Sequence, residues 1–285
     1  MKTLNAPAKV NLALDILGTR PDGFHNMRMV MQTISLRDTV TVEETEAGFD
    51  LHTDGDFIPA GKKTLEQRAS EAFFATIGKP MPGLRVTLEK VTPAYAGLGG
   101  GSADVAALLR ILREKYAPEL PTTELERIGF TVGSDMPFCV RGGTALAKGR
   151  GEVLTDLPPL PDCWFVLCKP DFGIPTPSLF ELVDGGELTC RPDIEGMRMS
   201  LEAGDLVGVA RRLGNVFEEV LPEEYHTVFK IKRRLLECGA LNAAMSGSGP
   251  TVFGIFTEQE TAQQAAEILK QDYRQTYLAV PVKKF

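Results

Sequence analysis

A glycine-rich segment, Gly97-Leu98-Gly99-Gly100-Gly101-Ser102, has the composition of an anion-binding loop. Apolar residues predict a strand over residues 84–91 before it and a helix over residues 102–116 after it. Glycines let backbone N–H groups converge on an anion, and the positive end of the helix dipole would point at the same place. The segment is therefore predicted to bind a phosphate chain, the alternative being a flexible turn.

Two better-known phosphate-binding motifs do not fit this segment. A P-loop requires Lys and then Ser or Thr after its last glycine, whereas Ser102 is followed by Ala103. A Rossmann motif would require Gly or Ala at position 102. The predicted phosphate site therefore belongs to neither of these classes.

A second glycine cluster, Ser246-Gly247-Ser248-Gly249-Pro250, precedes a predicted strand over residues 251–256. It is either another phosphate-facing loop or a plain hairpin turn. Taken alone, the composition favours the turn, because Ser-Gly pairs are ordinary turn residues. Only proximity to the first glycine segment would change that preference.

A lysine and an aspartate are candidates for a catalytic pair. Apolar residues alternate over residues 10–16, which predicts a half-buried strand with Lys9 and Asn11 on its polar face. Asp135 comes shortly before Pro137, so a turn is predicted there. Phosphoryl transfer to an alcohol uses a carboxylate to orient or deprotonate the hydroxyl and cations on the transferred group. Either residue taken alone is more often a solvated surface charge.

Phe24 and His25 follow the turn residues Pro21-Asp22-Gly23. An aromatic ring beside an imidazole suits stacking on a planar ring and hydrogen bonding to its edge. An equally good interpretation is a phenylalanine that anchors the loop beside an exposed histidine.

The elements that must position these residues predict an α+β chain. The first part is β-rich, with further strands over residues 27–36 and 39–44 and helices over residues 64–77 and 122–130. A boundary is predicted at the Pro-rich residues 157–161, which gives domains at residues 1–156 and 157–285. The second part has predicted strands over residues 164–168, 251–256 and 276–282, and helices over residues 177–182, 206–213, 222–238 and 258–273.

Composition limits the partners and the compartment. The 285 residues include 31 Lys and Arg against 38 Asp and Glu, a formal net charge of −7, which argues against nucleic acid or an anionic membrane as the partner. The five cysteines include no CxxC pair, and histidines are too scarce for a zinc pattern. With no apolar leader and no run of about 18 apolar residues, a cytoplasmic protein with reduced thiols is expected.

Three motifs together resemble the GHMP kinase superfamily along essentially the whole chain. They are Pro7-Ala8-Lys9-Val10-Asn11-Leu12, residues 93–103 ending in GLGGGSA, and residues 242–254 reading NAAMSGSGPTVFG. Residues 20–25, 133–138 and 174–180 resemble, within it, the subfamily that phosphorylates 4-diphosphocytidyl-2-C-methyl-D-erythritol.

The resemblance implies a two-domain GHMP kinase fold. Its β-rich N-terminal domain would carry the phosphate loop at a helix N-terminus, and its C-terminal domain would be ferredoxin-like. The implied reaction is ATP-dependent phosphorylation of the 2-hydroxyl of the methylerythritol moiety, in the non-mevalonate route to isoprenoid precursors. Asp135 would be the catalytic base and Lys9 its partner, with ATP accompanied by Mg²⁺ and no metal held by the protein.

The resemblance also implies roles for two sets of binding residues. Phe24 and Phe180 would sandwich the cytosine, and His25 would hydrogen-bond its edge. The implied ATP contacts are Lys90, Pro93, Gly97, Leu98, Gly99, Gly100, Gly101, Ser102, Ser246 and Gly247, and the implied acceptor contacts are Asn11, Phe24, His25, Thr176 and Phe180. The chain departs from the family in two places, with Thr64 where Asn is usual and Phe24 where Tyr is common.

Two other functions remain open from the sequence. One is another GHMP kinase, acting on mevalonate, homoserine or a sugar, against which the Phe24–His25 pair favours a pyrimidine acceptor. The other is an inactive ligand-binding member, against which Lys9, Asp135 and the complete glycine segment speak. The expected partners are ATP and a small molecule, with neither nucleic acid nor membrane, in a monomer or weak homodimer.

Overall fold

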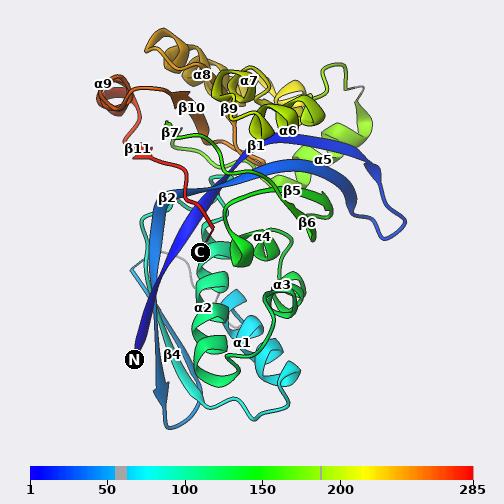
Figure 1. Cartoon of the computed structure of the whole chain (residues 1–285), viewed down its shortest axis with the longest axis vertical. Helices are drawn as coiled ribbons and strands as arrows, with labels where there is room; N and C mark the ends of the chain where they lie inside the picture. The colour runs from blue at the N-terminus through cyan, green and yellow to red at the C-terminus, as the bar shows by residue number, and fades with distance from the viewer. Residues whose placement is uncertain (55–62, 187, 285) are drawn as a thin grey trace. The chain divides into compact units, whose positions relative to one another are not determined.

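A computed structural model describes residues 1–54, 63–186 and 188–284, which form two compact units (Figure 1). The first unit comprises Met1–Ala8, Arg37–Thr92 and Gly99–Arg141, and the second Lys9–Leu36, Pro93–Leu98 and Gly142–Phe285. The units alternate along the chain because the long strands β1 (Lys2–Thr19) and β2 (His25–Thr45) run through both. The predicted domain division at residues 156 and 157 stays a prediction, and these units do not follow it.

The first unit combines part of a sheet with a group of helices. The end of β2 pairs antiparallel with β4 (Gly83–Glu89), which pairs parallel with β3 (Phe49–Thr53). The helices are α1 (Leu65–Thr76), α2 (Gly100–Tyr116), α3 (Thr122–Phe130) and α4 (Met136–Arg141). Helix α2 packs against the other three. Its apolar residues recur at helical spacing and are buried, as the sequence predicted.

The second unit contains the other ends of β1 and β2. There β1 pairs parallel with the two-residue β8 (Gly214–Asn215), and β2 pairs antiparallel with β5 (Thr144–Gly149). Strand β6 (Val153–Asp156) adds to β5. Strands β5 and β6 were not predicted. Strand β5 contains two alanines and a glycine, which have a low preference for strands, and β6 has only four residues.

A separate four-stranded sheet in the second unit has the order β11-β7-β10-β9. Its strands are β7 (Trp164–Lys169), β9 (Asn242–Met245), β10 (Val252–Phe256) and β11 (Gln275–Ala279). All neighbours are antiparallel, and α8 (Thr227–Glu237) and α9 (Gln259–Asp272) pack on this sheet. In chain order the strands lie 4-1-3-2, which confirms the predicted ferredoxin-like arrangement.

Shorter helices complete the second unit. They are α5 (Thr176–Gly185), α6 (Ile194–Glu202), α7 (Leu206–Arg211) and the 3-10 turns η1 (Val216–Val220) and η2 (Glu223–Tyr225). Helix α6 and strand β9 were not predicted. The helix predicted over residues 222–238 begins only at Thr227, because Glu223–Tyr225 form the tighter 3-10 turn η2.

Candidate active site

The first glycine segment leads directly into α2. Gly97 and Gly99 have φ angles of +72° and +67°, a left-handed conformation that glycine adopts at little cost. The helix begins at Gly100, two residues earlier than predicted, so Gly100, Gly101 and Ser102 form its first turn. Since no side chain caps this end within the described residues, the N–H groups of the first turn suit an anion.

The second glycine cluster is the turn between β9 and β10, and it also contacts the first segment. The Ser246 hydroxyl donates to the Gly97 carbonyl oxygen at 2.9 Å and accepts from the Asn11 backbone N–H at 3.3 Å. Residues 149 positions apart are thereby joined. The cluster is therefore a hairpin turn, as its composition favoured, and this turn contacts the predicted phosphate loop.

Lys9 lies where β1 meets both glycine segments. Its side chain is almost fully buried, and Nζ donates to Asn11 Oδ1 at 2.7 Å. Its backbone N–H donates to the Leu98 carbonyl oxygen at 2.9 Å. A Cβ atom added to Gly247 would lie 3.3 Å from Lys9 Nζ, so the second turn approaches the ammonium closely. The structure thus brings Lys9, Asn11 and the predicted loop residues of this unit together.

Replacing Gly97 by alanine is expected to lower the free energy of unfolding by about 2 to 4 kcal/mol. The new Cβ would overlap the Ser246 carbonyl oxygen, and the φ angle would be strained for alanine. Urea denaturation measures the change. Gly101→Ala is the matched control, because its Cβ would meet, among the described residues, only Leu65 at 3.8 Å, and alanine is favoured within the helix α2. Equal stability of both variants would contradict the close packing at Gly97.

Asp135 lies on the turn between α3 and α4, as predicted. Its carbonyl oxygen accepts the Cys139 N–H at 3.1 Å, so its backbone belongs to the start of α4. Pro137 is compatible with the helix because it lies in the first turn, where no N–H partner is required. Asp135 belongs to the first unit and Lys9 to the second, and their pairing remains a prediction.

Lys90, at the end of β4, is held by two buried carboxylates. Its Nζ lies 2.6 Å from Asp38 Oδ2 and also pairs with Asp104. Asp38 Oδ1 in addition accepts the N–H groups of Val91 and Thr92, at 2.6 and 2.7 Å. Burial raises the pKa of the Asp104 carboxyl to about 7 despite the nearby ammonium. The chain leading from β4 toward the glycine segment is therefore fixed by charge-assisted hydrogen bonds.

Two of the predicted acceptor residues, His25 and Phe180, form an aromatic cluster with Phe217 in the second unit. The rings of His25 and Phe180 stack with centroids 4.4 Å apart and planes 23° apart. His25 Nε2 lies 2.8 Å from Asp184 Oδ1, and this bond is the main reason that the Asp184 pKa is lowered. The Arg150 guanidinium lies 3.4 Å from the Phe24 ring centroid. The structure thus stacks Phe180 on His25, while the sandwich of Phe24 and Phe180 remains a prediction.

Three further residues were singled out from the sequence. Thr176 begins α5, and its hydroxyl lies 2.7 Å from that of Ser248 in the second glycine turn. Pro93 is half-buried and precedes the first segment. Thr64, which replaces the usual Asn, caps α1 by accepting the Gln67 N–H at 3.2 Å.

Relatives of this chain match nearly its full length. A protein of Moorella thermoacetica named 4-diphosphocytidyl-2-C-methyl-D-erythritol kinase is 43% identical over 277 residues, which cover 96% of each chain. One of the same name from Clostridium tetani is 38% identical, covering 97% of this chain and 98% of the relative. Residues 64–143 match the GHMP kinases N terminal domain, and residues 197–275 match GHMP kinases C terminal. The chain belongs to the 4-diphosphocytidyl-2-C-methyl-D-erythritol kinase family of GHMP kinases.

Solved structures agree with this kinase family. A crystal structure of 4-(cytidine 5'-diphospho)-2C-methyl-D-erythritol kinase is 32% identical, with a TM-score of 0.82 and coverage of 98% of this chain and 99% of that one. L. major mevalonate kinase in complex with R-mevalonate has a TM-score of 0.75 at 17% identity, covering 100% of this chain and 96% of that one, and shares the fold. The two-domain GHMP kinase fold is thereby confirmed.

Several residues that contact the predicted site of this kinase were missed from the sequence. They are Asp38, Asp104, Arg150, Asp184, Asn215 and Phe217. The sequence carried a signal for one of them, since Asp104 interrupts the apolar face of a predicted helix. The others act through contacts with residues far away in the chain.

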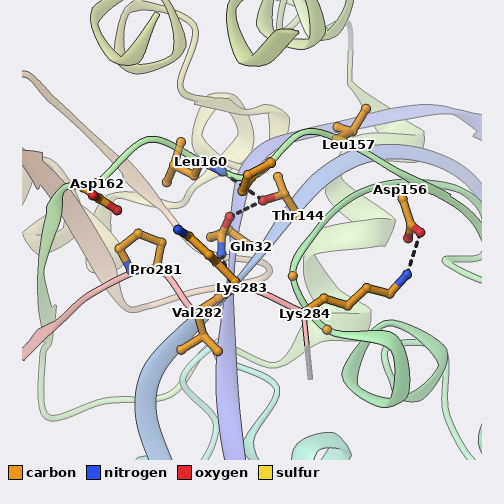
Figure 2. Close-up of a pocket in the computed structure, with 13 residues that line it drawn as sticks. Gln32, Thr144, Asp156, Leu157, Leu160, Asp162, Pro281, Val282, Lys283 and Lys284 are labelled. Carbon is orange, nitrogen blue, oxygen red and sulfur yellow. Dashed lines mark hydrogen bonds and ion pairs between the residues drawn. The ribbon is translucent and has the colours of Figure 1, made fainter. Parts of the chain in front are cut away.

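A cavity of about 250 Å³ lies elsewhere in the second unit (Figure 2). Pro159, Leu160, Pro281 and Val282 are among its lining residues, and none of the predicted site residues is. Gln32 and Thr144 bond to each other at 2.6 Å within it, and Lys284 pairs with Asp156 at 2.6 Å. The cavity is therefore separate from the predicted site of this kinase.

Two further findings concern cofactors and membranes. Within the described parts of the chain, no three or more His, Cys, Asp or Glu side chains are grouped as ligands for a metal ion. None of the helices in those parts has the length and apolar character needed to span a bilayer.

Proposed function

We propose that this chain transfers the γ-phosphoryl group of ATP to the 2-hydroxyl of 4-diphosphocytidyl-2-C-methyl-D-erythritol. The observation that carries the proposal is the 43% identity, over nearly the whole chain, with a relative that bears the name of this kinase. The geometry around Lys9 supports it, because a buried ammonium lies against two glycine turns.

ATP, as its magnesium complex, is proposed to bind at the first turn of α2. The backbone N–H groups of Gly100, Gly101 and Ser102 would face its phosphates, and the left-handed Gly97 and Gly99 allow that approach. Ser246 and Gly247 contact Gly97, at the start of the glycine segment. Lys90 and Pro93 would lie near the nucleotide, with Lys90 oriented by Asp38 and Asp104.

Asp135 and Lys9 are proposed to carry the chemical step. The acceptor oxygen attacks the γ-phosphorus, its proton passes to the Asp135 carboxylate, and the bond to the β-phosphate oxygen breaks to release ADP. Lys9 would offset the charge on the transferred group. Asn11 orients Lys9, because its side-chain oxygen accepts from Nζ at 2.7 Å.

The acceptor's cytosine is proposed to bind at Phe24, His25 and Phe180. His25 would bond the edge of the base, and its ring is already oriented by Asp184 and Phe180. Thr176 and Asn11 would lie along the remainder of the acceptor, toward the glycine turns.

Phe180→Ala is expected to raise the acceptor KM by about 5- to 150-fold, because stacking on a base contributes roughly 1–3 kcal/mol. The KM for ATP should stay within twofold. Steady-state kinetics with each substrate varied in turn measures both. Phe229→Ala is the matched control, since Phe229 of α8 also lies against a histidine ring, that of His226. An unchanged acceptor KM for Phe180→Ala would contradict the cytosine site.

A coupled assay of ATP consumption with different acceptors tests the function itself. The cytidyl diphosphate should be phosphorylated, whereas methylerythritol 4-phosphate should be a poor substrate, because binding energy from the base is lost. Mevalonate, homoserine and galactose test the other GHMP kinase activities. Turnover of one of these instead, or no ATP consumption with any, would contradict the proposal.

We also infer a reducing compartment, the cytoplasm, and a monomer or weak homodimer. Burial raises the pKa of the Cys163 and Cys168 thiols to about 12, so neither supplies a reactive thiolate at neutral pH. Non-reducing mass analysis of the protein purified from cells tests the thiol state, and sedimentation tests the oligomer.

A further inference from the structure

The buried side chain of Asn215 joins the second glycine turn to β8. Asn215 is 6% exposed, and β8 pairs with β1 so that Asn215 lies opposite Leu14. Its Nδ2 donates to the Met245 carbonyl oxygen at 2.8 Å and to the Gly247 carbonyl oxygen at 2.7 Å. Both amide hydrogens are therefore used on the chain that enters and forms the turn.

The turn needs such support because β9 is at the edge of its sheet. An edge strand leaves backbone groups on one side without a neighbouring strand. Here Asn215 binds the Met245 carbonyl oxygen, and Glu218 Oε1 accepts the Met245 N–H at 2.7 Å. Glu218 is in turn paired with Lys232 of α8. Side chains of residues 215–218 thus take the place of a strand partner.

The same asparagine also fixes the start of η1. Its Oδ1 accepts the Phe217 N–H at 3.1 Å, which caps the turn that carries the buried Phe217 ring. That ring meets Phe180 edge to face, with centroids 5.1 Å apart. Phe180 stacks on His25. One side chain therefore contacts the chain beside Lys9 and, through one neighbour, the aromatic cluster.

We propose that Asn215 is a positioning residue that holds the Lys9 side and the aromatic side of the active site in one geometry. The inference rests on the proposed function, because it assigns the phosphoryl group to the first side and the acceptor base to the second. Asn215 touches neither substrate. It acts on the position of the acceptor hydroxyl relative to the transferred group, and a displacement of about 1 Å there can cost roughly 100-fold in rate.

Asn215→Asp removes both donors and places a carboxylate beside two carbonyl oxygens. The variant is expected to lower kcat at least 10-fold at pH 8, while the dissociation constants of ATP and of the acceptor, each measured alone by calorimetry, stay within threefold. Asn215→Ala removes the donors without adding charge, and the same division between kcat and binding is expected. It also provides the test if the Asp variant does not fold.

Asn242→Asp is the matched control. Asn242 lies at the opposite end of β9, and its Nδ2 donates to the Ala210 carbonyl oxygen at 2.8 Å. Loss of this hydrogen bond should lower the melting temperature, as the Asn215 substitutions do, but kcat should stay within twofold. Full kcat in both folded Asn215 variants would overturn the proposal, as would an equal loss of kcat in Asn242→Asp.

The proposed function and the role of Asn215 fail separately in this experiment. A wild-type enzyme that does not phosphorylate the cytidyl diphosphate contradicts the acceptor assignment alone. The Asn215 and Asn242 variants are then compared on whichever alcohol the wild type phosphorylates, with the same expected difference in kcat.

Discussion

Asp135→Asn is expected to lower kcat by about 10²- to 10⁴-fold or more, the usual contribution of a general base. The amide keeps the shape of the carboxylate but cannot accept the proton of the acceptor hydroxyl. Both substrates should still bind, with dissociation constants within threefold of the wild type. Single-turnover measurement with saturating ATP and acceptor isolates the chemical step.

Asp205→Asn serves as the control for this substitution. Asp205 caps the six-residue helix α7 by accepting the Gly208 N–H at 2.9 Å, and asparagine is an equally good cap. Asp135 similarly precedes the six-residue helix α4, so neither change should disturb folding. An Asp135→Asn enzyme with near-wild-type kcat would remove Asp135 from the mechanism.

Lys9→Met is expected to lower kcat by about 10²- to 10³-fold through lost charge stabilisation in the transition state. The side chain is buried and methionine fills a similar volume, but Asn11 Oδ1 loses its donor, so the melting temperature should fall by no more than in Lys169→Met, described below. A decrease in kcat far greater than that of a variant with a similar loss of stability distinguishes a catalytic charge from a structural one. Differential scanning calorimetry and steady-state kinetics on the same preparation measure both.

Lys169→Met is the matched control, because Lys169 is also buried in the second unit. Its Nζ donates to the Pro170 and Phe172 carbonyl oxygens, at 3.0 and 3.2 Å. Burial lowers the pKa of this lysine. Its removal should change stability with less than a tenfold effect on kcat. If Lys9→Met lost only stability and kept kcat, Lys9 would be a structural residue.

The second glycine cluster shows why contacts decide what composition cannot. From residues 246–250 alone, a hairpin turn was preferred, and the structure confirms the turn. Its contact with Gly97 depends on a hydrogen bond across 149 positions, which no local window contains. Only the tertiary structure shows that both glycine segments lie beside Lys9, which supports a phosphate-binding role for the second one.

The aromatic cluster differs from its prediction for a similar reason. His25 and Phe180 were both singled out, but the stack between them was not. Asp184, which orients His25, is 159 residues away from it, and Arg150 reaches Phe24 from the turn after β5. Side-chain pairing of this kind follows from how β2, β5 and α5 pack in the second unit.

By itself, the sequence determined the helices and strands whose apolar residues recur at a regular spacing. It also determined the glycine segment before α2, the turn at Asp135 and the kinase family. These features depend on neighbouring residues, whose spacing sets backbone conformation and the buried face of each helix or strand. Only the tertiary structure decided which side chains orient the site. Asn215 shows this best, because its local signal is only that of a turn cap, whereas the proposed role depends on two carbonyl groups about 30 residues later in the chain.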